Sequence, residues 1–246
     1  MKKNTKDTLF YSAVFIIYFF IALIFGNIFK NASRLADIVN ALNNNPAVIV
    51  DAGHGGEDGG AIAIDGETLE KDLNLSIAIK LSDMLKKNNI STFMIRSKDE
   101  SIYKKDDHKK TLRKKKIEDL KNRVTIANSN NKNILISIHQ NKFTDESLTG
   151  MQIFYSGNNE HSVTLANFIK DELEKNISQA NFRENKKANK EIYLLRNTKV
   201  PAIIIECGFI SNKEELKKLT SEDYQNKIAQ CIFAGIKNFL DKTNSN

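Results

Sequence analysis

Short apolar runs alternate with longer amphipathic stretches from residue 47 to the C-terminal end of the chain. Six runs of four or five residues are rich in Val and Ile or other strand-forming residues, which predicts β-strands. Three of them (AVIV, ILISI and AIII) are apolar on both faces, a pattern typical of central strands that are covered on both sides. The predicted strands are Ala47–Val50, Thr92–Ile95, Ile134–Ile138, Met151–Tyr155, Ile192–Leu195 and Ala202–Ile205.

The stretches between these runs place apolar residues at helical spacing. The predicted helices are Leu73–Lys87, Ile117–Asn128, Ser162–Ile177 and Tyr224–Leu240. Strands that alternate with helices of this length predict an α/β fold: a single three-layer domain with a mostly parallel central sheet of about six strands flanked by helices. We place this domain at residues 47–241, followed by a short tail at 242–246.

The N-terminal part of the chain has the pattern of a transmembrane helix. Residues 9–29 are uncharged and mostly apolar, and three lysines precede them. About twenty apolar residues are needed to cross a bilayer, and the lysines favour a cytoplasmic N-terminus. We therefore expect a cytoplasmic N-terminus at residues 1–8, a signal anchor at 9–29 and a linker at 30–46, in which Arg34–Leu42 has the pattern of a short helix. A cleaved signal peptide is the alternative, although the sequence after the apolar stretch is a poor cleavage site.

The charge of +7 is concentrated in one basic run, from Lys104 to Arg123, in which acidic residues are interleaved. Only Tyr103, at its edge, could stack on a base, so the pattern does not favour nucleic-acid binding. Several interpretations stay open for this run: a solvated helix face, or a surface that faces the polyanionic wall, an anionic membrane or a docking partner.

The two cysteines do not indicate a disulfide scaffold or a structural zinc site. Cys207 lies inside an apolar run and Cys231 in a helical pattern, so both are expected to be small buried hydrophobic residues. Their spacing matches no thiolate zinc motif.

Four residues suited to metal chemistry follow predicted strands or open a predicted helix. His54, His139 and Glu206 come after the first, third and sixth strand-like runs, and Glu70 precedes the first helix. In a parallel sheet, the carboxyl ends of the strands share one edge, which would bring these residues together. Two imidazoles and one carboxylate leave an open position on a tetrahedral zinc ion, and a second carboxylate can transfer protons.

Each of these residues also has an ordinary structural interpretation. His139 can be a hydrogen-bonded core histidine, and Glu70 can be a first-turn carboxylate favoured by the helix dipole. Glu206 is the hardest to explain in this way, because a carboxylate directly after four apolar residues is costly to bury without a partner. His108 and His161 lie in polar surroundings and are expected at the surface.

Several separated motifs, in order, resemble the zinc-dependent N-acetylmuramoyl-L-alanine amidases of the type-3 catalytic family. They are VIVDAGHGGEDGGA, TLEKDLNL, IEDLKNRVTIAN, ILISIHQN, YLLRNTKVPAIIIECGFISN and YQNKIAQCIFAGIKNFL. The resemblance implies that His54, Glu70 and His139 bind Zn²⁺ and that Glu206 is the catalytic base and acid. It also implies that Asn141 and Arg96 support the site or the substrate. The family cleaves the amide between N-acetylmuramic acid and L-alanine in peptidoglycan.

The basic segment KKTLRKKKIEDLKNRV, the GGEDGGA loop and the single anchor look like the germination-specific branch of this family. That branch implies removal of stem peptides during spore cortex maturation, before muramic-δ-lactam formation, in a pathway that also uses a deacetylase. It implies an extracytoplasmic, membrane-anchored location on the cortex side of the forespore. Because no wall-binding repeat is recognised in the sequence, the membrane anchor is expected to supply the location. Control is expected to come from the timing of expression or from a regulatory or activating protein partner.

Two other functions remain as alternatives. A catalytically silent relative that binds peptidoglycan or a partner protein is expected to lack one of the four site residues, and all four are present. A zinc peptidase is disfavoured by the absence of an HExxH pattern.

Overall fold

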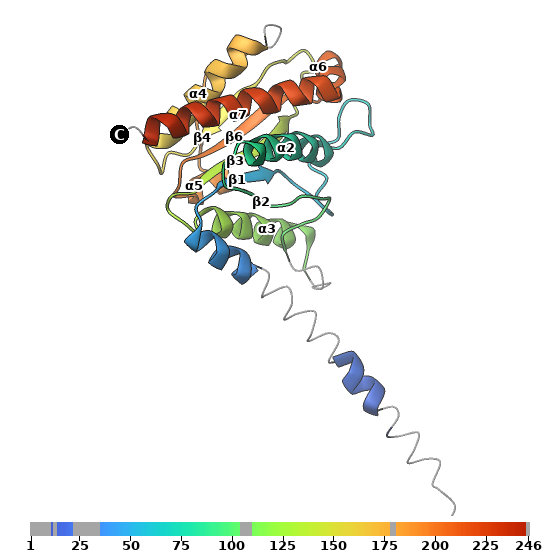
Figure 1. Ribbon diagram of the computed structural model, residues 1–246. Helices are drawn as coiled ribbons and strands as arrows, with labels where there is room; N and C mark the ends of the chain where they lie inside the picture. The colour runs from blue at the N-terminus through green and yellow to red at the C-terminus, as the bar shows by residue number, and fades with distance from the viewer. Residues whose placement is uncertain (1–10, 12–13, 22–34, 104–109, 178–180, 245–246) are drawn as a thin grey trace, which may run out of the picture.

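The computed structural model describes residues 11, 14–21, 35–103, 110–177 and 181–244, and those from residue 47 onward form a three-layer α/β domain (Figure 1). Its central sheet has the strand order β2-β1-β3-β6-β4-β5. The strands β1, β2, β3 and β6 are parallel, whereas β4 is antiparallel to β6 and parallel to β5. The sheet is therefore mixed, with a parallel centre as predicted. The strands are β1 Val48–Ala52, β2 Thr92–Met94, β3 Ile134–Asn141, β4 Gln152–Tyr155, β5 Lys186–Lys187 and β6 Ala202–Phe209.

Helices cover both faces of this sheet. On one face lie α2 (Glu70–Lys87), α4 (His161–Asn176) and α7 (Glu222–Asn244), and on the other lie α3 (Leu112–Ala127), α5 (Tyr193–Asn197) and the helical residues 35–44 (Figure 1). Each face has its own apolar core, because successive strand residues point to opposite sides. The predicted coverage of the central strands on both faces is confirmed.

One predicted strand is wrong. Ile192–Leu195 does not pair in the sheet; the segment forms the five-residue helix α5, which buries Leu194 and Leu195 against the α3 side of the sheet. A run of four apolar residues fits one helical turn as well as a strand, so periodicity cannot distinguish the two. The edge position beside β4 is taken by the exposed Lys186–Lys187 pair, which has no apolar pattern that would predict a strand.

The strands β1, β3 and β6 run further at their carboxyl ends than the sequence predicts, and the extension of β3 and β6 positions the site. The strands β3 and β6 continue past Ile138 and Ile205, so His139 and Glu206 lie within paired strands rather than in loops. A short helix, α6 (Lys213–Leu219), was not predicted; it follows β6 and is capped by the Asn212 side chain.

The N-terminal segment is described only in part. No described helix is both long and apolar enough to span a bilayer, and most of the predicted anchor at residues 9–29 lies outside the described residues. The short helix expected in the linker is present at residues 35–44, and its Leu42 is buried in the same core as Ile126 of α3. Both cysteines are buried and free, in agreement with the prediction.

Candidate metal centre

A tight loop after β1 presents His54 at the carboxyl end of the sheet. The backbone φ of His54 is 62°, a left-handed conformation that is uncommon for residues other than glycine. At Gly53, an added Cβ would lie 2.3 Å from ring atoms of His139, so only glycine fits there. The loop therefore allows the two imidazole rings to approach, with centroids 5.1 Å apart.

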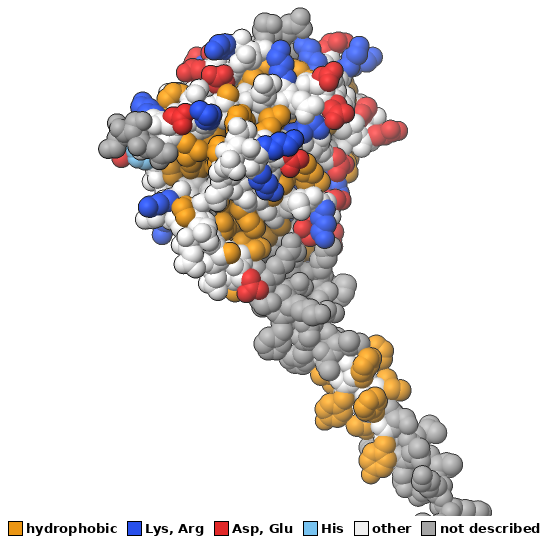
Figure 2. Space-filling view, viewed as in Figure 1, with side chains coloured by type: hydrophobic (Ala, Val, Ile, Leu, Met, Phe, Trp, Pro, Cys, Tyr) orange, Lys and Arg blue, Asp and Glu red, His pale blue; other side chains and the backbone are white. Residues whose placement is uncertain are grey.

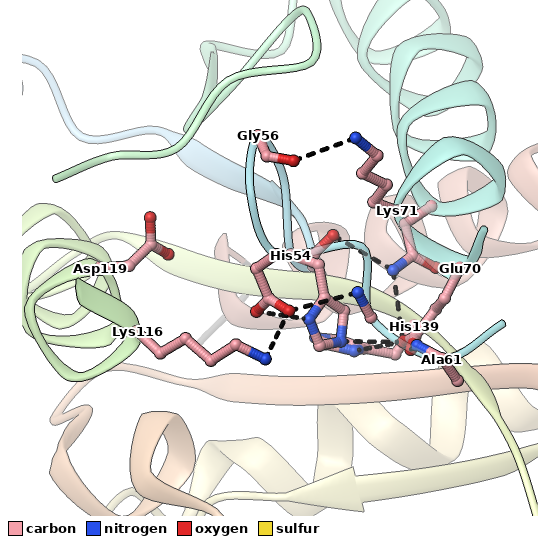
Figure 3. A network of polar contacts seen from close by, with 12 residues as sticks. His54, Gly56, Ala61, Glu70, Lys71, Lys116, Asp119 and His139 are labelled. Atoms are coloured by element: carbon pink, nitrogen blue, oxygen red, sulfur yellow. Dashed lines mark hydrogen bonds and ion pairs between the residues drawn. The ribbon is translucent and has the colours of Figure 1, made fainter. Parts of the chain in front are cut away.

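The carboxylate of Glu70, the first residue of α2, lies between the two rings (Figure 3). Its Oε1 is 3.2 Å from Nε2 of His54 and 2.9 Å from Nδ1 of His139. All three potential ligand atoms lie within 4.8 Å of one another. Since zinc binds nitrogen and oxygen at about 2.0–2.1 Å, neighbouring ligands of a tetrahedral ion are roughly 3.3 Å apart. The three side chains are thus already spaced so that one ion can bridge them.

Hydrogen bonds fix the orientation of these side chains. Nδ1 of His54 lies 2.9 Å from Oδ2 of Asp58, which leaves its Nε2 facing Glu70. The backbone N–H of Ala61 donates to Oε2 of Glu70 at 2.9 Å, so Oε1 is the carboxylate oxygen that faces the two imidazole rings. A carboxylate behind a ligating imidazole is the usual support of a zinc ligand, because it fixes the tautomer and the ring orientation.

The charges of this cluster shift the pKa of its members. Burial disfavours the imidazolium of His54, but hydrogen bonds to Asp58 and Glu70 outweigh it and raise the pKa of His54 to about 9. Burial also opposes ionisation of Glu70, yet His139 and His54 hold the pKa of that carboxyl well below its usual range. The carboxyl group of Glu70 is therefore ionised at neutral pH.

Glu206 lies beside this cluster on the neighbouring strand. It is the register partner of His139 in the parallel pair of β3 and β6, immediately before the ladder becomes irregular. Its Oε2 is buried and has no hydrogen-bond partner among the described residues. Burial raises the pKa of Glu206 to about 7, with Glu70 adding to the rise and His139 opposing it. A carboxyl group with a pKa near neutrality is suited to accept and return a proton.

The sequence of residues 48–238 matches the N-acetylmuramoyl-L-alanine amidase family, Amidase_3. The chain belongs to this family. The match covers all six strands of the sheet and all four candidate residues of the centre.

Individual relatives agree with this assignment. The amidase is 35% identical over 193 residues to the germination-specific N-acetylmuramoyl-L-alanine amidase of Bacillus subtilis, which covers 78% of this chain and 79% of that protein. It is similar, with a TM-score of 0.75 and 42% identity, to the CwlD amidase of Clostridioides difficile, solved in complex with the GerS lipoprotein; the match covers 80% of this chain and 99% of that chain. The catalytic domain of CwlV from Paenibacillus polymyxa matches with a TM-score of 0.67 and 30% identity, over 80% and 98% of the two chains.

Two buried arginines hold the His54 loop of the amidase. Arg96, which the sequence singled out, donates from Nε to the carbonyl of Ala52 at 2.8 Å and from Nη2 to the carbonyls of Gly53 at 2.9 Å and Lys71 at 2.7 Å. It therefore ties the loop to the first turn of α2 through backbone carbonyls.

Arg123 of α3 was not singled out from the sequence, although it lies in one of the family motifs. It pairs with Asp51 and Asp119, and its Nη2 donates to the carbonyl of His54 at 2.7 Å. Its side chain is 3% exposed. The only local signal for this role was the acid–base pair of Asp119 and Arg123, one helical turn apart.

A second unpredicted residue, Asn74, lies one turn after Glu70 on α2 and is fully buried. Its Nδ2 donates to the carbonyl of Gly53 at 3.2 Å and lies 3.5 Å from Oε1 of Glu70, and its Oδ1 accepts from Nε2 of Gln140 at 3.2 Å. The side chain thus connects α2, the His54 loop and β3, which carry the three potential ligands.

Asn141 ends β3, where it is partly buried and its carbonyl accepts from the N–H of Ile210 at 2.8 Å. The structure places it two residues from His139, beyond the irregularity in the ladder. His161, expected at the surface, is exposed at the start of α4, whereas His108 lies outside the described residues.

A pocket of about 280 Å³ opens beside the two imidazoles, between α3 and α5. Its walls are mostly apolar, and Lys116 stands among its polar residues with Nζ 2.7 Å from Oδ1 of Asp58 (Figure 3). The apolar and aromatic lining residues are Leu120, Ile192, Tyr193, Leu194 and Ile204. The short helix α5, predicted as a strand, therefore forms one wall of this pocket.

Proposed function

We propose that this peptidoglycan amidase uses zinc to hydrolyse the bond between N-acetylmuramic acid and L-alanine, and that it does so in the spore cortex. The observation that carries the proposal is the convergence of His54, Glu70 and His139 on one point, with the carboxyl group of Glu206 on the adjacent strand. This arrangement provides three ligands and one separate proton-transfer group.

The donor set fits zinc. Two imidazole nitrogens and one carboxylate are a common set of protein ligands in catalytic zinc sites and leave a fourth position open. Bound zinc would polarise the scissile carbonyl and lower the pKa of an attacking water molecule. His54 and His139 would bind through Nε2 and Nδ1, the atoms that face Glu70 in the structure.

Glu206 would act as the base and then the acid of the reaction. Its raised pKa allows it to take a proton from water and to return that proton to the leaving amine. Return of the proton is required because an amine anion is a very poor leaving group. The apolar pocket between α3 and α5 would position the substrate by binding a group next to the scissile amide.

The biological setting is proposed from the relatives. Similarity to a germination-specific amidase supports a role in cortex maturation, upstream of the muramic-δ-lactam that a separate deacetylase helps to form. The CwlD amidase of C. difficile is found in complex with a lipoprotein, which supports a regulatory or activating lipoprotein partner for this chain.

Membrane anchoring through residues 9–29, with an extracytoplasmic catalytic domain, completes the proposal. The described part of this segment is helical at residues 14–21, and its large apolar side chains are exposed to solvent (Figure 2). Phe15 and Tyr18, for example, are 72% and 69% exposed. Contact between so many apolar side chains and water is unfavourable, whereas contact with the hydrocarbon core of a bilayer is favourable.

The test is digestion of purified cortex peptidoglycan by the full chain, with zinc or with a chelator, beside Glu206→Gln. We expect new amino-terminal L-alanine to be released only by the zinc-loaded wild-type chain. Release of peptides with other amino termini would contradict the bond assignment. Binding to the wall without any cleavage, even with a lipoprotein partner present, would favour the silent binding protein.

A further inference from the structure

The exposed face of α3 combines cations with an exposed apolar side chain. Arg113, Lys114 and Lys121 are exposed and have no acidic partner within the described part of the chain. Ile117 lies one helical turn from both Arg113 and Lys121, so the three share one side of the helix, and it exposes 41% of its surface. The acidic residues of α3 are turned to other partners: Glu118 pairs with Lys110, and Asp119 with Arg123.

The other basic residues of this helix have different roles. Lys115 pairs with Glu57 and Lys116 with Asp58, so both hold the GGEDGG loop next to the candidate metal centre. Arg123 is buried against the His54 loop. The basic run therefore divides into an inner set that supports the centre and an outer set that faces solvent.

The outer set lies on the side of the domain from which the N-terminal segment departs. The helical residues 35–44 share the α3 face of the sheet (Figure 1). Nδ2 of Asn130, in the turn after α3, donates to the carbonyls of Leu42 and Asn43 at 3.0 and 2.9 Å. The chain that leads to the apolar residues 14–21 is thus attached directly beside α3.

We propose that the outer face of α3, formed by Arg113, Lys114, Ile117 and Lys121, lies on the surface of the anionic membrane that holds the anchor. Cations attract acidic headgroups while isolated apolar side chains enter the interface, as in helices that lie on membranes. This inference rests on the proposed anchor, because residues 22–34 span at most about 45 Å when extended and so keep the domain near the bilayer. Contact through α3 would fix the orientation of the pocket, one wall of which α3 forms.

Charge and attachment favour a membrane over a wall polymer. A soluble polyanion would be attracted to the three cations, but it gives no reason for Ile117 to be exposed among them. A bilayer explains both features and is also the surface to which the neighbouring segment would be attached.

The test uses the full chain in nanodiscs of neutral phosphatidylcholine or of phosphatidylcholine with phosphatidylglycerol. An environment-sensitive fluorophore is attached at Ile117→Cys; the native Cys207 and Cys231 are buried and do not compete for the label. A second chain carries the label at Asp171→Cys, on α4 at the opposite face of the sheet. We expect a blue shift at position 117 in anionic nanodiscs only, lost at high salt, and no shift at position 171.

Removal of the outer cations should abolish the shift. Each adsorbed Lys or Arg strengthens association with an anionic membrane about fivefold, so Arg113→Gln/Lys114→Gln/Lys121→Gln should weaken docking of the face about 100-fold. The matched control, Lys213→Gln/Lys217→Gln/Lys227→Gln, removes the same charge from exposed positions of α6 and α7 and should leave the shift unchanged.

The possible outcomes test the proposed membrane anchor and the proposed docking of α3 separately. A chain that fails to enter nanodiscs refutes the anchor and this inference with it. If the chain enters the nanodiscs but the label at position 117 has the same emission wavelength in both lipid compositions, docking through α3 is refuted and the anchor is not. A shift produced by soluble poly(glycerol phosphate), but not by the anionic bilayer, would identify a wall polymer as the occupant and overturn the proposal.

Discussion

Glu206 and His139 are direct register partners on the adjacent parallel strands β6 and β3. The pairing places the carboxyl group of Glu206 next to an imidazole that faces Glu70, and its buried Oε2 accepts no hydrogen bond from the described part of the chain. The ladder becomes irregular immediately after this pair, so their side chains occupy the last regular position at the carboxyl end of the sheet. Such a position suits a group that works beside a metal ligand without being one.

Glu206→Gln should abolish hydrolysis and retain zinc. The side-chain amide of the introduced glutamine cannot accept a proton from water. General acid–base catalysis typically contributes about 10²- to 10⁴-fold to a reaction rate. The measurement is the rate of L-alanine amino-terminus release, together with zinc content by elemental analysis. Glu214→Gln, an exposed position in the first turn of α6, is the control and should be fully active. Loss of zinc by Glu206→Gln would instead make Glu206 a ligand.

His139→Ala should lose bound zinc, because a site with His54 and Glu70 alone holds the ion with two ligands. Chelator competition and elemental analysis measure the loss, and circular dichroism checks that the sheet is intact. His161→Ala, at an exposed position of α4, is the matched control. Full zinc content in His139→Ala would contradict the proposed ligand set.

Asn74→Ala should weaken zinc binding by about 10- to 100-fold, the usual effect of removing a group that supports a metal ligand. The variant removes the bonds from α2 to Gly53 and to Gln140, while Glu70 itself stays in place. Competition with a chelator of known affinity measures the change. Asn226→Ala on α7 serves as the control. If Asn74→Ala changes only the unfolding midpoint and leaves zinc affinity as it was, then Asn74 has a purely structural role.

Arg123→Ala should lower the free energy of unfolding by about 3–5 kcal/mol, because it leaves a buried carboxylate without its partner. That carboxylate is Asp51, which is 1% exposed and also accepts from the Ser137 hydroxyl at 2.7 Å. Urea denaturation measures the loss. The control is Lys121→Ala, at an exposed position of the same helix, which should change the free energy of unfolding by less than about 0.5 kcal/mol. Equal effects of the two substitutions would contradict the role of the buried pair.

The same pair should make stability dependent on acid pH. Burial opposes ionisation of Asp51, but the charge of Arg123 holds the pKa of Asp51 below its ordinary value of 3.8. A depressed pKa contributes stability that is present above the unfolded value and is lost as the pH falls through the folded value. The unfolding free energy should therefore decline more steeply below about pH 4 in the wild type than in Asp51→Asn. Parallel declines in the two chains would show that Asp51 titrates normally.

The sequence alone determined the layered α/β fold and the four residues that the centre brings together. Apolar runs of strand length, alternating with helical stripes, are local patterns, and in a parallel sheet they place the ends of the strands at one edge. His54, Glu70, His139 and Glu206 follow from that topology because each lies at the end of an apolar run or the start of a helix. Their roles came from the resemblance to the amidases.

Only the tertiary structure decided what supports these residues. Arg123 and Asp51 are 72 residues apart, and nothing in the local pattern around either one predicts that they pair. The segment Tyr193–Asn197 forms a helix that buries its two leucines beside α3. The edge position in the sheet is occupied instead by two exposed lysines, Lys186 and Lys187. Local periodicity specifies which face of an element is apolar, but which long-range contacts satisfy its polar groups depends on the packed fold.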